Sequence, residues 1–139
     1  LKKENTFLMT YGDGLSNVNL TKLINAHKKN KKICTLTAVN PAGKFGDLLL
    51  NDNIVEKFDE KPISPNNWVN GGYFVMNKKI FDYLENDQSV LEADALVALS
   101  KDKELAYFKH SGFWKPMDTL NDKNMLNNLW HKNKAPWKI

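Results

Sequence analysis

A short apolar run that ends abruptly in a glycine-flanked aspartate most constrains how this chain folds. The run is Phe7–Thr10, and Tyr11-Gly12-Asp13-Gly14 follows it directly. A run this short with a glycine-flanked end predicts a buried strand, most simply a parallel one. In open α/β sheets, ligands bind just beyond the carboxyl ends of such strands, which is where Asp13 falls. Gly12 and Gly14 free the backbone to turn and let a ligand approach closely.

Asp13 admits two interpretations at this stage. A carboxylate at the end of a strand suits a hard cation such as Mg²⁺, which proteins hold with one or two carboxylates plus substrate phosphates. Alternatively, Gly12-Asp13-Gly14 is only a turn, in which the Asp13 side chain accepts hydrogen bonds from backbone amides. For these residues taken alone, the turn is the simpler interpretation.

The composition indicates a folded domain over residues 1–139, whole or in part. Hydrophobic residues make up 42% of the chain and charged residues 26%, which excludes a disordered tail. The net charge is +4, and every basic residue counted in it is Lys, because the sequence contains no Arg. Bidentate recognition of phosphate or guanine by Arg is therefore absent, and we expect no nucleic-acid partner. No apolar run has membrane-spanning length and no apolar signal core is present, so we expect a cytoplasmic protein without membrane association.

A single cysteine, Cys34, excludes an internal disulfide framework and a cysteine-based zinc site. It lies within the apolar run Ile33–Val39, so we expect a buried and inert thiol. The run is rich in β-branched residues and predicts a strand over residues 33–40. Before it, apolar residues recur at helical spacing and predict a helix over about residues 20–29, capped by Asn17 or Asn19, with His27 at the edge of the core. Strand, helix and strand together predict a βαβ unit and a parallel sheet.

The remaining elements are predicted from turn and capping residues. A hairpin through Asp52-Asn53 is expected over residues 48–51 and 54–60. Gly71-Gly72 opens a buried strand over residues 68–77, where a glycine pair usually means that something packs against bare backbone. Helices are expected after Asn77 and over about residues 91–99, and a strand over residues 104–110. Thr119 with Asp122 resembles a capping box for a last helix, and Trp137 is a candidate packing anchor in the tail.

Four pieces of the chain, in order, resemble the sugar-phosphate nucleotidyltransferases, and most closely the glucose-1-phosphate cytidylyltransferases. Each piece alone is weak, but the ordered set is specific, and the last piece carries most of the weight. The resemblance covers nearly the whole chain and implies a Rossmann-like α/β fold with a mixed, mostly parallel sheet and flanking helices. The pieces are Tyr11-Gly12-Asp13-Gly14, Glu60-Lys61-Pro62, Asn70-Gly71-Gly72 and Gly112-Phe113-Trp114-Lys115-Pro116-Met117-Asp118-Thr119.

The resemblance implies a reaction in which CTP and glucose 1-phosphate give CDP-glucose and pyrophosphate, in the biosynthesis of nucleotide sugars such as those of lipopolysaccharide O-antigens. Asp13 and Asp118 match the family's Mg²⁺-binding carboxylates. Lys61 matches the lysine that contacts the sugar phosphate, and these three are the expected catalytic residues. The positions expected to contact substrate are Gly12, Asp13, Gly46, Glu60, Lys61, Asn70 and Gly71.

The chain departs from the family in one important element. The family's nucleotide-binding half begins with a Gly-x-Gly-Thr-Arg-Leu loop, which is absent from this sequence, as is every Arg. We therefore expect this chain to be the C-terminal portion of a nucleotidyltransferase, lacking the first strands, and to bind CTP poorly and catalyse little alone. The segment Leu91–Leu96 also lacks an expected Trp and Pro, although Glu92 matches. The complete protein is expected to form a homo-oligomer.

Alternatives remain open for single residues and for the whole chain. The alternative for Lys61 is a surface lysine, and the alternative for Glu60 is a residue that pairs with other charges on a strand rim. The alternative for Asp118 is a residue that opens the last helix. Phe113 and Trp114 are better explained by packing than by stacking on a base. For the chain as a whole, the rivals are a receiver-type signalling domain, a non-catalytic sugar-phosphate-binding module, and a nucleotidyltransferase that uses another NTP.

Overall fold

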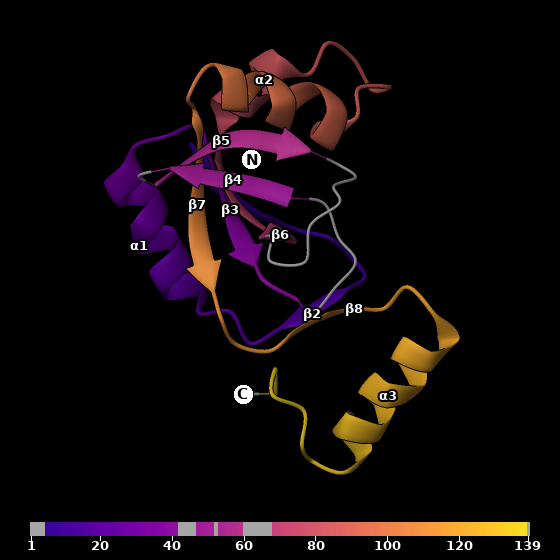
Figure 1. Cartoon of the computed structure of the whole chain (residues 1–139). Helices are drawn as coiled ribbons and strands as arrows, with labels where there is room; N and C mark the ends of the chain where they lie inside the picture. The colour runs from indigo at the N-terminus through magenta and orange to yellow at the C-terminus, as the bar shows by residue number, and fades with distance from the viewer. Residues whose placement is uncertain (1–4, 42–46, 52, 60–67, 139) are drawn as a thin grey trace.

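A computed structural model describes residues 5–41, 47–51, 53–59 and 68–138 of the chain. A six-stranded mixed sheet forms its centre, with the order β1-β6-β3-β7-β5-β4, and a two-stranded ribbon of β2 and β8 lies beside it (Figure 1). Of the pairs between these strands, β3 and β7 run parallel and the others run antiparallel. The strands are β1 (Thr6–Thr10), β2 (Gly14–Ser16), β3 (Cys34–Val39), β4 (Asp47–Asn51), β5 (Ile54–Asp59), β6 (Val69–Asn77), β7 (Leu105–His110) and β8 (Trp114–Pro116).

Helices cover both faces of the six-stranded sheet. Helix α1 (Leu20–Asn30) lies on one face, where Leu23 and His27 are buried. On the other face, the π-helical turn η2 (Leu91–Leu96) and α2 (Val97–Lys101) bury Ala95, Leu96 and Leu99 against strand residues that include Leu36 and Phe74. A 3₁₀ helix, η1 (Lys78–Tyr83), follows β6, and α3 (Leu120–His131) lies beyond the β2–β8 ribbon (Figure 1). The predicted α/β class with a mixed sheet is confirmed.

Capping chemistry read from the sequence matches the observed helix ends. Asn19 caps α1, since its side-chain oxygen accepts a hydrogen bond from the amide of Lys22 at 2.9 Å. Asn77 caps η1 in the same way through the amide of Lys79 at 3.0 Å. The predicted hairpin is present as β4 and β5, and Asn53 in its turn adopts a positive φ of 76°.

Strand β1 differs from its prediction in both partner and burial. It was expected to be a buried strand in a parallel βαβ unit with the strand that follows the first helix. Instead β6 lies between β1 and β3 and is antiparallel to both. Because β1 is the edge strand, burial alternates along it: Phe7 and Met9 pack on the core, whereas Leu8 is 50% exposed. The expectation of a mostly parallel sheet is also wrong. Strand β6 is antiparallel to β1 and β3, and β5 is antiparallel to β4 and β7.

Two predictions about single buried residues are confirmed. Cys34 is fully buried, and burial raises the pKa of its thiol, so the thiolate needed for nucleophilic chemistry is suppressed. His27 is only 6% exposed and its Nδ1 lies 2.9 Å from Thr35 Oγ1, which makes it a core-edge histidine. Burial lowers the pKa of His27.

Within the described residues, no helix is long and apolar enough to cross a membrane.

Candidate active site at the end of β1

Three segments that are distant in sequence meet where β1 ends. The first is Tyr11–Gly14, the second is the start of β6, and the third runs from β8 into Asp118. Gly14 pairs with Pro116 across the β2–β8 ribbon, and the amide of Met117 donates to the carbonyl of Asp13 at 2.8 Å. The ribbon therefore holds the backbone at Asp13 directly beside the residue that precedes Asp118.

Asp13 and Asp118 are both exposed, and neither side chain has a hydrogen-bond or ion-pair partner in the part of the chain that the structure describes. The simpler interpretation of Asp13 was that its side chain accepts hydrogen bonds from backbone amides in a turn. Among the described residues, no such hydrogen bond is present. Within the described ranges, no cluster of three or more His, Cys, Asp or Glu residues is arranged to hold a metal ion. What the fold does bring together is this pair of backbone segments, each carrying one carboxylate.

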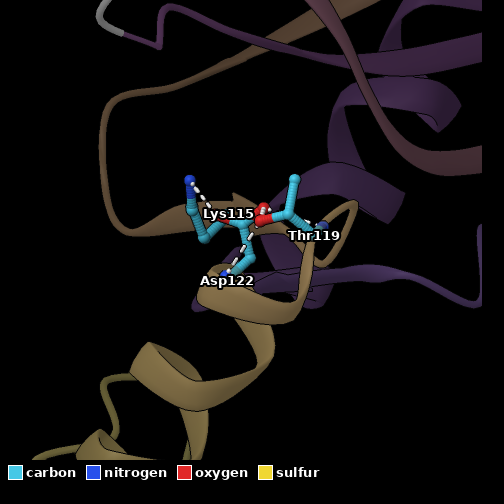
Figure 2. Close-up of polar contacts among 3 residues, drawn as sticks. All are labelled: Lys115, Thr119 and Asp122. Atoms are coloured by element: carbon cyan, nitrogen blue, oxygen red, sulfur yellow. Dashed lines mark hydrogen bonds and ion pairs between the residues drawn. The ribbon is translucent and has the colours of Figure 1, made fainter.

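The start of α3 is capped without Asp118. Thr119 is the N-cap: its Oγ1 accepts from the amide of Asp122 at 3.1 Å, and its own amide donates to Asp122 Oδ2 at 3.0 Å (Figure 2). Lys115 Nζ lies 2.7 Å from Asp122 Oδ1. The hydrogen bond from Lys115, followed by those from Thr119, lowers the pKa of Asp122 to about 2. The predicted capping box is confirmed, and it leaves the Asp118 carboxylate uncommitted to the helix end.

Gly71 is required by packing before any ligand is considered. A Cβ atom at this position would lie 2.9 Å from Val39 Cγ1 and 3.1 Å from the carbonyl oxygen of Thr37, so β3 approaches the bare backbone. The carbonyl of Gly71 accepts a hydrogen bond from Trp114 Nε1 at 2.8 Å. Trp114 thereby ties β8 to β6, in keeping with the packing role expected of it.

Tyr11 links the same end of β1 to two other segments. Its phenol donates to Glu92 Oε1 of η2 and accepts from Asn70 Nδ2 at 2.9 Å. Asn70 Oδ1 in turn accepts from the amide of Gly72 at 2.9 Å. Burial, and after it the hydrogen bond to Glu92, raise the pKa of Tyr11 far above its usual value, so the phenol stays protonated.

A cavity of about 380 Å³ opens at the carboxyl ends of the parallel neighbours β3 and β7, with Trp114 in its wall. This is the end of parallel strands at which α/β sheets bind ligands. His110 is held at its wall, with Nε2 3.2 Å from both Ser16 Oγ and the carbonyl oxygen of Phe113. The lining consists of Val39, Asn40, Pro41, Trp68, His110, Ser111, Gly112 and Trp114.

The sequence-predicted site residues therefore fall into two groups. The structure gathers Gly12, Asp13, Asn70, Gly71 and Asp118 around the end of β1. Gly46, Glu60 and Lys61 lie outside the described residues, and their roles stay predictions. Sequence reasoning missed Trp68 and His110 as cavity residues, Tyr11 as the partner of Asn70, and Glu92 as the partner of Tyr11. The position of Trp68 and His110, at strand ends of a predicted sheet, was the signal that could have found the first two.

Comparison with known proteins identifies relatives that match nearly the whole chain. Glucose-1-phosphate cytidylyltransferase of Salmonella typhimurium is 44% identical to this chain over 138 residues, which cover 99% of this chain and 54% of that protein. Mannose-1-phosphate guanyltransferase of Saccharomyces cerevisiae is 28% identical over 133 residues, covering 91% of this chain and 36% of that protein. The chain thus spans about half the length of the cytidylyltransferase that it matches.

Fold and family comparisons lead to the same group. The crystal structure of HddC from Yersinia pseudotuberculosis superposes with a TM-score of 0.78 at 18% identity, over 92% of this chain and 56% of that one, and so shares its fold. The family model described as nucleotidyl transferase matches residues 1–128, which excludes the receiver-type alternative. This chain belongs to the nucleotidyl transferase family.

Proposed function

We propose that the protein carrying this chain transfers CMP from CTP to glucose 1-phosphate, giving CDP-glucose and pyrophosphate. The observation that carries the proposal is the 44% identity, over 99% of this chain, to a relative named glucose-1-phosphate cytidylyltransferase. In this reaction a phosphate oxygen of the sugar phosphate bonds to the α-phosphorus of CTP, and the bond from that phosphorus to the bridging oxygen breaks as pyrophosphate leaves. Two polyanions must meet, so the site has to offset their repulsion.

Asp13 and Asp118 are proposed to hold Mg²⁺ at the junction of β2 and β8. They fit such an ion because their segments are joined by the bond from Met117 to Asp13, and both carboxylates are exposed and unpaired among the described residues. Magnesium is commonly held by one or two carboxylates that substrate phosphates complete. When bound, the ion would offset the negative charge of the reacting phosphates.

The sugar phosphate is proposed to lie in the cavity between β3, β7 and β8. Trp68 and Trp114 supply apolar walls for a sugar ring, and Trp114 Nε1 donates to the carbonyl of Gly71, the residue that follows Asn70. Lys61 would contact the phosphate, Glu60 would accept from sugar hydroxyls, and Gly46 and Gly12 would let the ligand approach the backbone. We further propose a cytoplasmic homo-oligomer that supplies nucleotide sugar to O-antigen synthesis and that binds neither nucleic acid nor membrane.

Two other functions are weighed against this one. The first is a nucleotidyltransferase that uses another NTP and sugar 1-phosphate, as the 28% identical mannose-1-phosphate guanyltransferase is named for. The higher identity of the cytidylyltransferase favours CTP. The second is a non-catalytic sugar-phosphate-binding module, which would bind glucose 1-phosphate and release no pyrophosphate.

Pyrophosphate release by the native protein carrying this chain tests the proposal. CTP, GTP, UTP and dTTP are each supplied with glucose 1-phosphate or mannose 1-phosphate, with and without Mg²⁺. We expect release with CTP and glucose 1-phosphate that requires Mg²⁺ and falls about 100-fold or more in Asp13→Asn and Asp118→Asn, since a metal stabilises the transition state by several kcal/mol. Asp87→Asn, an exposed carboxylate in the turn between η1 and η2, is the matched control and should keep full activity. No release with any pair, or a preference for another nucleotide, would refute the assignment.

A further inference from the structure

The side chain of Asn70 bonds to the protein through both its oxygen and its nitrogen, and in the described part of the chain one of its N–H donors has no partner. Its Oδ1 accepts from the amide of Gly72 at 2.9 Å, and its Nδ2 donates to the Tyr11 phenol oxygen at 2.9 Å. An amide of this kind carries two N–H groups on its nitrogen. Among the described residues, the second N–H of Asn70 has no acceptor, so it is available for a ligand. Because a backbone N–H can only donate, the side-chain oxygen of Asn70 must point toward the amide of Gly72. The side-chain nitrogen then points toward Tyr11.

Glu92 determines the direction of the second bond. The phenolic O–H of Tyr11 donates to Glu92 Oε1, since a carboxylate oxygen accepts hydrogen bonds. With its proton used in this way, the phenol oxygen is left as an acceptor and matches the N–H of Asn70. Every hydrogen bond in this network therefore has one defined donor and one defined acceptor. The network joins Glu92, Tyr11, Asn70 and Gly72. The phenol remains protonated because burial and Glu92 both raise the pKa of Tyr11.

Packing fixes the Tyr11 ring where its phenol can bond to both Glu92 and Asn70. The amide of Tyr11 donates to the carbonyl of Gly72 at 2.9 Å, and its ring lies where a Cβ of Gly72 would be, 2.5 Å from Cδ2. Phe74 meets the ring edge-on at a centroid distance of 5.4 Å. Glu92 itself sits in a π-helical turn, a distortion that occurs frequently at functional sites.

We propose that Glu92, acting through Tyr11, is a positioning residue of the sugar-phosphate site, and that it fixes Asn70 so that one N–H donates to a hydroxyl oxygen of the sugar. The inference rests on the proposed function and deepens it, since it assigns the polarity with which the site reads the sugar. Glu92 and Tyr11 touch Asn70 or each other, and they need not touch the substrate.

Binding of deoxy sugars tests the assignment in the native protein carrying this chain. Dissociation constants are measured by titration calorimetry for glucose 1-phosphate and for its 2-, 3- and 4-deoxy analogues. The wild type should bind at least one analogue about 2- to 10-fold more weakly, the range expected for one neutral hydrogen bond. In Tyr11→Phe and Glu92→Ala that discrimination should vanish, because glucose 1-phosphate loses affinity while the same analogue does not. Glu92→Gln, whose side-chain carbonyl can still accept from the phenol, should restore part of it.

Tyr83→Phe is the matched control. Its phenol also donates to a carboxylate, Asp102 Oδ2 at 2.9 Å, but on an exposed surface outside this network. It should keep the wild-type discrimination. A merely structural effect of the Tyr11 and Glu92 variants would weaken all four ligands equally, and that result would overturn the proposal, as would unchanged discrimination.

A ligand-free readout separates this inference from the proposed function. The side-chain amide signals of Asn70 in ¹⁵N-resolved spectra should shift in Tyr11→Phe and Glu92→Ala and stay in place in Tyr83→Phe. Unmoved signals in the first two variants would refute the positioning role, whatever the substrate is. Failure of the wild type to bind glucose 1-phosphate, with the signals shifting as expected, would refute the proposed substrate and the sugar contact while leaving the positioning of Asn70 established.

Discussion

Replacing Gly72 by alanine tests how strongly the backbone fixes Tyr11. Gly72 adopts a positive φ of 74°, a conformation that L side chains rarely take. Its added Cβ would also lie 2.5 Å from Cδ2 of Tyr11 and 3.0 Å from Cγ. The ring cannot simply swing aside, because Asn70, Glu92 and Phe74 hold it from other directions. Both the strained backbone and the steric overlap should therefore lower the stability of Gly72→Ala.

The expected loss can be built from these two terms. A left-handed conformation costs a non-glycine residue about 1–2 kcal/mol. Forcing one extra carbon into a packed contact costs about 1–3 kcal/mol. The sum is about 2–5 kcal/mol in the free energy of unfolding, a large share of the about 5–15 kcal/mol that typical domains possess. With a urea m-value of about 2 kcal/mol/M, the midpoint should fall by about 1–2.5 M.

Urea unfolding of Gly72→Ala, followed by tryptophan fluorescence, measures this loss. Gly12→Ala is the matched control, since a Cβ there meets nothing within 4 Å and the change should be nearly neutral. Combining Gly72→Ala with Tyr11→Ala should remove the overlap and leave the backbone term, so the two changes should couple by about 1–3 kcal/mol. A midpoint for Gly72→Ala equal to that of Gly12→Ala would show that Gly72 and Tyr11 are not packed as described.

Three further predictions concern charge and the open sheet edge. In the native protein, Lys61→Ala should raise KM for glucose 1-phosphate and leave CTP binding nearly unchanged, at a cost of about 1.5–3 kcal/mol; an equal loss for CTP would contradict its role. The folded-state pKa of Asp122, about 2, lies below the ordinary value near 3.9, so its stabilising contribution is complete above about pH 4 and disappears as the pH falls toward 2. The difference in Tm between wild type and Asp122→Asn should shrink over that interval, and a constant difference would refute the effect. The isolated 139 residues should self-associate through β1 and release no pyrophosphate, and Leu8→Lys should reduce the association seen by sedimentation.

Local chemistry was readable from the sequence because it depends on near neighbours. The capping box of Thr119 and Asp122 spans three residues, and Asn19 and Asn77 each cap through an amide two or three residues on. The burial of Cys34 followed from the apolar run around it. Each of these features needs only the intrinsic preferences of a short segment, so tertiary structure had little opportunity to overrule them.

Strand order was not readable in the same way. Nothing within Phe7–Thr10 indicates that β6, more than 50 residues later, enters the sheet between β1 and β3. An apolar run looks the same whether the strand is central or at an edge, and exposure of Leu8 follows only from the order. The helix expected over residues 91–99 contains a π-helical turn for which the sequence carries no local signal.

The candidate site divides along the same line. Asp13, Asn70 and Asp118 were predicted as site residues through the resemblance of their motifs, and the fold brings their segments together. The bonds that orient Asn70 join it to Tyr11 across 59 positions and Tyr11 to Glu92 across 81, so no spacing rule predicts them. They arise from the close packing of β1, β6 and η2, which only the folded chain supplies.

Anomalous diffraction from the native protein crystallised with Mn²⁺, CTP and glucose 1-phosphate tests the central claim most directly. Mn²⁺ prefers the same oxygen ligands as Mg²⁺ and reports its position by its own scattering. The account predicts a peak within coordination distance of both the Asp13 and Asp118 carboxylates, in contact with a phosphate, with the sugar beside Asn70. A metal bound elsewhere, or the two carboxylates pointing to opposite faces of the sheet, would contradict it.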